Sequence, residues 1–201
     1  TRPMACCAPG WLFFGPTEPV VLNPIGDYRL KSDDFAYIGG SRNWSRVLEN
    51  LFLPHNAHIV PSWRITTWAL VRAAGSISRV PDVFAIAAYG MLVTVILLTG
   101  RLVARETNHW TPAVAAMIGV GSTSVMWMPA IWFSAGQTLW AGAGILVALG
   151  VAQDFRRWGG FWRLPALALV VMIAGGFWTI GHAAGPVSAI YLWCDGRRRC
   201  R

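Results

Sequence analysis

Charged residues are scarce in this sequence. Only 13% of its 201 residues are charged and 55% are hydrophobic, whereas about a quarter of an average soluble domain is charged. This shortage argues against an ordinary soluble protein and indicates a membrane protein. The 12 Trp residues support the same interpretation, because the indole ring favours the interface between lipid and water.

Cysteine is also sparse, and its positions exclude two common uses. The spacing is not that of a metal site, and a vicinal pair is a poor start for a disulfide framework. We therefore expect no redox role for the four cysteines, Cys6, Cys7, Cys194 and Cys200. The first residue is Thr and no signal peptide can be recognised, so we expect a fragment that lacks an N-terminal anchor helix.

Basic residues exceed acidic ones, giving a formal net charge of +8. They do not form one stripe with interleaved aromatic residues, which a nucleic-acid-binding domain would show. Most stand between apolar segments, where they suit contact with anionic lipid headgroups. We therefore expect the lipid bilayer as a partner and no nucleic acid.

The chain divides into two regions by composition. Residues 1–82 hold six of the nine acidic residues and eight of the 17 basic ones, with frequent Pro and Gly, and we expect them to face water. Within them, 43–52 and 62–74 have apolar residues at helical spacing, which predicts two amphipathic helices on the membrane surface. In 62–74 the predicted apolar face contains Ile65, Trp68 and Ala69, with the stem of Arg72.

Residues 83–201 contain the long apolar runs, so the predicted fold is an all-α polytopic bundle of about four to five membrane segments. A run of about 20 apolar residues is long enough to cross a bilayer. The predicted spans are 83–104, 113–133, 135–152 and 164–180, with a further segment over 185–194. Small residues four apart, such as Gly144 and Ala148, would allow close helix packing.

The arginines between these runs predict the orientation. Arg101 and Arg105, and later Arg156, Arg157 and Arg163, flank the apolar runs, whereas the turn near Ser134 has no charge. Basic loops usually stay in the cytoplasm. We therefore expect an integral protein of the bacterial inner membrane, with residues 1–82 outside the cytoplasm.

Two adjacent carboxylates, Asp33 and Asp34, occur in LKSDDFAYIGG. A solvated turn or a helix start would explain them. The aromatic and apolar residues that follow would instead hold the pair at the membrane surface. Two like charges held side by side suit proton abstraction or cation binding, so both residues are candidates for catalysis.

A second group of candidates lies in LPHNAHIVPSWR, where His55 and His58 stand between two prolines and Arg64 follows. The two histidines could bind a divalent metal with Asp33 or Asp34. Alternatively, the histidines and Arg64 could hold a phosphate beside the carboxylates. The sequence leaves both uses open and implies no organic cofactor.

The order of DDFAYI, NWSRVLENLF and a loop with His and Pro before an apolar helix resembles the first extracytoplasmic loop of GT-C glycosyltransferases. The likeness is to the protein O-mannosyltransferase-like and tetratricopeptide-containing mannosyltransferase-like branches. A second stretch, SVMWMPAIWFSAGQTLWAG, resembles the second luminal turn of these integral-membrane enzymes. The resemblance covers roughly residues 30–152.

This resemblance implies transfer of a sugar from a polyprenyl-phosphate donor, with inversion, to an acceptor that the sequence does not identify. It implies that Asp33 is the catalytic base and that Asp34 occupies the second acidic position. The chain departs from the family at Gln137, where many relatives carry Arg or an acid, and in lacking the first and the later membrane helices. We therefore expect that catalysis needs more than this fragment.

Two other classes of function remain open from the sequence. A transport or channel protein would use small-residue helices and His182 to line a path, and a membrane scaffold would keep only the fold. Few acidic residues occur inside the predicted spans, which argues against transport. Glu49 is interpreted as a solvated charge on a surface helix.

Overall fold

The computed structural model describes residue 34 and residues 38–54 and 58–199. This part of the chain contains α-helices and short 3-10 helices and no β-strand, which confirms the all-α prediction. The α-helices are α3 (Trp44–Asn50), α4 (Pro61–Ala74), α5 (Val80–Thr107), α6 (Trp110–Ser122), α7 (Ser124–Ile131), α8 (Phe133–Trp158), α9 (Arg163–Gly175) and α10 (Ala184–Arg199). The 3-10 helices are η1 (Ile77–Arg79) and η2 (Thr179–Ala183).

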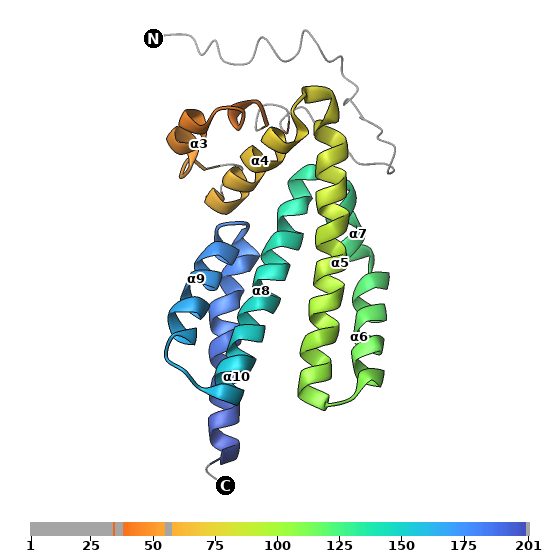
Figure 1. Cartoon of the computed structure of the whole chain (residues 1–201), viewed down its shortest axis with the longest axis vertical. Coiled ribbons are helices and arrows are strands. Elements are labelled where there is room, and N and C mark those ends of the chain that lie inside the picture. Colours follow the sequence, from red (N-terminus) through yellow and green to blue (C-terminus); the bar gives the residue numbers. More distant parts are fainter. Residues whose placement is uncertain (1–33, 35–37, 55–57, 200–201) are drawn as a thin grey trace, which may run out of the picture.

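Helices α5 and α8 form the centre of the bundle (Figure 1). They run in the same direction, and α6 and α7 return the chain between them. Helices α9 and α10 cover the other side of α8, and α3 and α4 lie across the end where α5 and α8 begin. We call this the α4 end, and the opposite end, where α5 and α8 finish, the arginine end.

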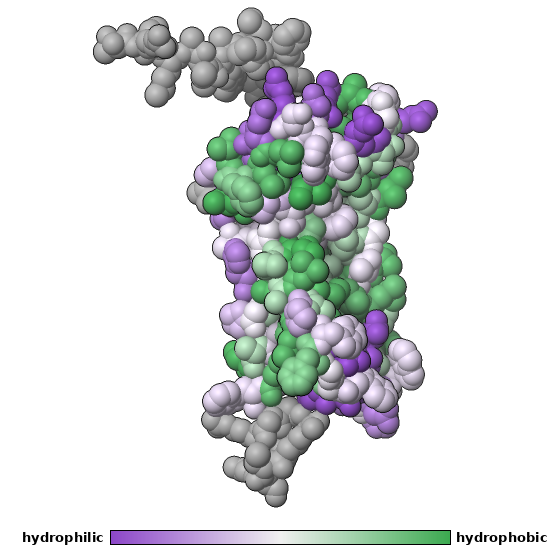
Figure 2. Space-filling model, turned by 60° about the vertical axis from the view of Figure 1, so that its left-hand side comes forward, coloured by the Kyte–Doolittle hydropathy of each residue, from purple (hydrophilic) through white to green (hydrophobic). Residues whose placement is uncertain are grey.

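The surface of the molecule is banded in the way expected of a membrane protein. In Figure 2, hydrophilic side chains gather near the two ends, and hydrophobic side chains predominate between them. Two helical stretches in the described residues are long and apolar enough to cross a membrane, Ile77–Thr107 and Phe133–Trp158. A third candidate is the pair of α6 and α7, if they are taken as one broken span.

The prediction of four to five membrane segments is therefore wrong, and one reason is a break inside 113–133. Helices α6 and α7 are bent by 62° relative to each other. Thr123 between them has extended backbone, with φ −76° and ψ 134°. A β-branched residue amid Gly and Ser favours such a break, and Pro129 inside α7 removes a further backbone donor.

The later predicted spans, 164–180 and 185–194, are too short or too polar. Helix α9 ends at Gly175 after 13 residues, which gives a length of about 20 Å against about 30 Å of hydrocarbon. After α9 the chain forms the 3-10 helix η2. Helix α10 has 16 residues and ends in a run of arginines, and it is not among the candidate spans.

Both predicted surface helices are present as α3 and α4, and α4 packs on the bundle through a face other than its predicted apolar one. Trp63, Thr67 and Ala74 are buried, whereas Ile65 is 41% exposed. The helix docks through the first set, and Trp63 packs on Phe84 and Phe133. Placement of these helices on a membrane surface stays a prediction.

Small residues set the contact between α8 and α9, as the spacing of Gly144 and Ala148 predicted. Ala148 and Ala174 are buried in one cluster with Ala184. A Cβ added at Gly144 would lie 2.6 Å from the Ala174 Cβ, so only glycine fits there. Helix η2, which follows α9, lies at the α4 end, where Thr179 contacts His58.

Candidate functional site

Asp34 is the one member of the acidic pair that the structure describes, and its side chain is completely buried at 0% exposure. The Ser134 hydroxyl, in the first turn of α8, donates a hydrogen bond to Asp34 Oδ1. A buried carboxylate is tolerated only with such partners. The bond joins residues 100 positions apart and brings together the two stretches on which the family resemblance depends. Asp33 lies outside the described residues.

Gln137 follows Ser134 by one helical turn and is also buried. Its Nε2 donates to the Ser134 carbonyl oxygen at 2.8 Å. Its Oε1 is buried and has no hydrogen-bond partner among the described residues. The first turns of α8 therefore present a buried acceptor next to the serine that binds Asp34, at the position where the sequence departs from the GT-C pattern.

His58 and Arg64 both lie at the α4 end and make contacts within the protein. His58 Nδ1 is 2.7 Å from Thr179 Oγ1, and its ring is 4.1 Å from that of Trp178 between centroids. Arg64, 9% exposed, donates from Nη2 to the Leu53 carbonyl oxygen at 3.3 Å. Arg64 thus joins Leu53 to α4, and His58 joins the residues directly before α4 to η2. His55 lies outside the described residues, and the phosphate role of all three stays a prediction.

The first turn of α4 is fixed to the segment after α9. Pro61 starts the helix at a position where no backbone donor is needed. Ser62 donates from its backbone N to the Gly176 carbonyl oxygen at 2.9 Å and from its hydroxyl to the Ile173 carbonyl oxygen at 2.9 Å. A Cβ at Gly176 would overlap the Ser62 hydroxyl. On the same side of the molecule, His58 contacts Thr179 of η2.

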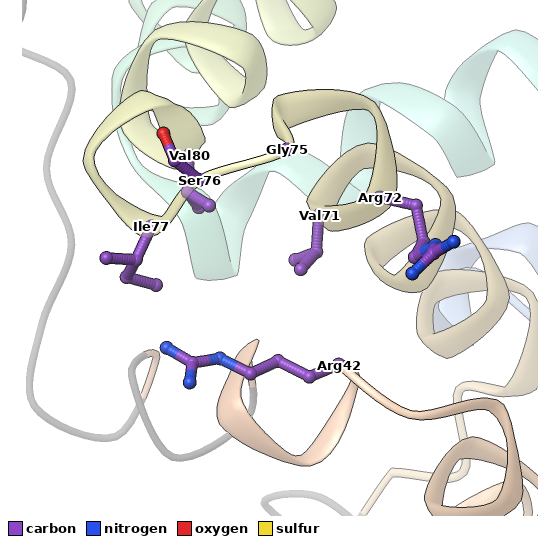
Figure 3. A pocket seen from close by; sticks show the side chains of 7 residues that line it. All are labelled: Arg42, Val71, Arg72, Gly75, Ser76, Ile77 and Val80. Atoms are coloured by element: carbon purple, nitrogen blue, oxygen red, sulfur yellow. The ribbon is translucent and has the colours of Figure 1, made fainter.

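A pocket of about 370 Å³ opens at the same end, between the segment before α3 and the junction of α4 and α5. Figure 3 shows Arg42 and Arg72 bordering it from different segments, with their guanidinium groups pointing in opposite directions; Val71 lies between the two segments, and Ile77 lies near the tip of Arg42. Both guanidinium groups have no ion-pair or hydrogen-bond partner among the described residues, and no carboxylate lines the pocket. The pocket combines two available positive charges with apolar side chains.

Sequence reasoning missed this pocket. It assigned Arg72 to the face of a surface helix and did not consider Arg42. The available signal was weak: two arginines and several apolar residues on segments that no local pattern joins. Only the return of the chain between α3 and α4 brings them together.

A second feature missed from the sequence is a polar network at the arginine end. Glu106 accepts hydrogen bonds from Gln153 Nε2 at 2.8 Å, from Arg156 Nη2 at 3.0 Å and from the Tyr191 hydroxyl. Arg105 pairs with Asp154 at 2.7 Å. These contacts tie the last turns of α5 and α8 to α10. Glu106 and Asp154 stand at the ends of the spans, where they stabilise helix packing.

The described residues contain no group of three or more His, Cys, Asp or Glu side chains that could hold a metal ion. Two of the four predicted metal ligands, Asp33 and His55, lie outside these residues, so a metal at the acidic pair stays a prediction. Asp34 and His58 are both present, and their shown partners are the hydroxyl groups of Ser134 and Thr179.

Comparison with known proteins identifies no relative. No protein-family model, no curated protein and no solved structure matches this chain. The resemblance to GT-C glycosyltransferases therefore depends on the quoted sequence stretches alone.

Proposed function

We propose that this chain forms the acidic-pair region of an integral-membrane glycosyltransferase of the GT-C type, which transfers a sugar from a polyprenyl-phosphate donor. The observation that carries the proposal is the hydrogen bond from Ser134 to the buried Asp34. It joins the two separate stretches that resemble the family, at one end of a bundle with helices able to cross a membrane.

In this proposal Asp33 is the base and Asp34 is a positioning residue. The base takes the proton from an acceptor hydroxyl, whose oxygen attacks the anomeric carbon of the donor sugar. The bond from that carbon to the phosphate oxygen breaks, and polyprenyl phosphate leaves with the electron pair. A base positioned in this way is typically worth about 10²- to 10⁴-fold in rate. Asp34, fixed by Ser134, would hold the adjacent carboxylate in place.

The departing phosphate needs positive charge, and the pocket of Figure 3 is suited to supply it. Arg42 and Arg72 are exposed and have no partner among the described residues, whereas Arg64 is mostly buried. One guanidinium group can donate two parallel hydrogen bonds to two oxygens of a phosphate. The pocket also has an apolar wall of Val71, Ile77 and Val80, which suits a prenyl chain. We therefore add Arg42 and Arg72 to the predicted phosphate-binding residues His55, His58 and Arg64.

The proposed location is the bacterial inner membrane, with the α4 end outside the cytoplasm. The orientation is supported by the arginines at the opposite end of the bundle, since basic loops remain in the cytoplasm. These arginines are Arg101, Arg105, Arg156, Arg157 and Arg163. An active site at the bilayer surface would meet a lipid-linked donor directly. The sugar and the acceptor stay unassigned.

The test is transfer of a radiolabelled sugar from a polyprenyl-phosphate donor by the full-length protein in membranes. Asp33→Asn should reduce transfer by about 10² or more, because the amide cannot accept the proton. Asp82→Asn is the matched control, since Asp82 is a carboxylate in the first turn of α5 at the same end, and it should retain activity. Equal transfer by the wild type and Asp33→Asn would exclude Asp33 as the base.

A further inference from the structure

A second basic pocket lies at the arginine end, between the last turns of α5 and the start of α6. Its volume is about 450 Å³. The described residues that line it include Arg101, Arg105, Arg157, His109 and Trp110, and none of the described lining residues is a carboxylate. Nothing in the proposed transfer reaction uses this pocket, because it is at the opposite end of the bundle from Asp34.

The turn between α5 and α6 accounts for the position of these side chains. Asn108 ends α5 in the left-handed conformation, with φ 56°, and its backbone N donates to the Ala104 carbonyl oxygen at 2.9 Å. After this two-residue turn α6 runs back along α5. The helices touch at Gly100, where an added Cβ would lie 2.6 Å from Met117 Cγ. Basic and apolar side chains therefore border the same pocket.

The positive charge of the pocket is only partly neutralised. Arg105 pairs with Asp154 at 2.7 Å. Arg157 donates to the Arg105 carbonyl oxygen, which bears no full charge. Arg101 is exposed and has no hydrogen-bond or ion-pair partner in the part of the chain that the structure describes. The guanidinium groups of Arg101 and Arg157 are thus left for an anion.

The apolar side of the pocket indicates which anion would bind. Leu97, one turn before Arg101, is 56% exposed and lines the pocket with Met117. Trp110 is 74% exposed beside the basic residues, a position typical of the membrane interface. A lipid phosphate would meet the arginines while the first methylene groups of its acyl chain meet Leu97, and a free inorganic anion would leave the apolar side unused.

We infer that this pocket binds the phosphate headgroup of an anionic membrane phospholipid, with Arg101 and Arg157 contacting the phosphate. Basic pockets between membrane helices commonly bind anionic headgroups. The inference is independent of the glycosyltransferase proposal, because neither the acidic pair nor the pocket of Figure 3 takes part in it.

The test is binding of phosphatidylglycerol to the purified full-length protein in detergent micelles, measured by native mass spectrometry. Arg101→Gln should weaken binding about tenfold or more, which is the value of a charge-assisted hydrogen bond. Arg157→Gln should do the same. Arg163→Gln is the matched control: Arg163 is at the same end but contacts Trp162 and the Gly159 carbonyl oxygen. It should weaken binding by about fivefold at most, the general effect of one surface charge.

Two further measurements distinguish the source of the phosphate and its location. Phosphatidylcholine and inorganic phosphate should bind at least about tenfold more weakly than phosphatidylglycerol. Brominated phosphatidylglycerol should quench Trp fluorescence less in Trp110→Phe than in the wild type. Equal losses in the Arg101 and Arg163 variants, equal binding of the two lipids, or competition by inorganic phosphate at the lipid's own concentration would each overturn the inference. Arg101 has no hydrogen-bond or ion-pair partner among the described residues, so its variant should keep the wild-type circular dichroism.

Discussion

Replacing Ser134 by Ala should lower the stability of the protein by about 1.5–3 kcal/mol, the value of a hydrogen bond to a charged group. The structure explains this magnitude. Asp34 is completely buried, so bulk water does not compensate its carboxylate for the lost hydroxyl. Asp34 also has a further interaction besides Ser134, so the loss stays below the roughly 3–5 kcal/mol that breaking a buried ion pair costs.

The assay is chemical unfolding of the protein in detergent micelles, followed by far-ultraviolet circular dichroism. Asp34→Ala, Ser134→Ala and the double variant form a cycle, which should give a coupling energy of about 1–3 kcal/mol. Ser122→Ala is the control, because Ser122 is exposed and the Gly119 carbonyl oxygen of its own helix is the one partner of its hydroxyl among the described residues. Its effect should stay within about 0.5 kcal/mol. Equal stabilities of the Ser134 and Ser122 variants would refute the hydrogen bond.

The same assay tests two other contacts. Gly181→Ala should destabilise the protein by about 1–3 kcal/mol through overpacking, because its Cβ would overlap the Ala174 carbonyl oxygen. Gly142 is on α8, and an added Cβ there would have nothing within 4 Å. Gly142→Ala should therefore stabilise the protein by about 0.5–1 kcal/mol. A destabilised Gly142→Ala would contradict the packing described for α8. Glu106→Ala should cost about 1–3 kcal/mol, since the buried Gln153 loses one of its two acceptors and keeps the Leu102 carbonyl oxygen. Glu49→Ala, on the exposed side of α3, should change stability by less than about 0.5 kcal/mol. Similar effects of the two Glu substitutions would show that the network at the arginine end is not formed.

Long, strongly periodic segments could be predicted from the sequence. The predicted spans 83–104 and 135–152 lie within α5 and α8, and the surface helices predicted at 43–52 and 62–74 appear as α3 and α4. Apolar composition and helical spacing act within one segment, so they are visible locally. The break at Thr123 was missed because the run 113–133 has no charge, and hydropathy does not report a bend of 62°.

The buried face of α4 and the partner of Asp34 depend on distant segments. Helix α4 carries apolar residues on two sides, and the contact with Phe84 and Phe133 selects the side of Trp63. Ser134 resembles many other serines near helix starts, and nothing in a single sequence joins it to a carboxylate 100 residues earlier. The acidic pair could thus be recognised as a candidate, but its surroundings could not.

That separation in sequence also sets an order of events during synthesis. When Asp34 has just been added to the chain, the serine that will bind it is still 100 residues from being translated. At about 5–20 residues per second, the wait is roughly 5–20 seconds. The backbone anchor of α4 on Gly176 arrives later still. The α4 end therefore cannot be completed before α8 and the segment after α9 have been made, and Asp34 lacks its partner Ser134 until α8 is in place.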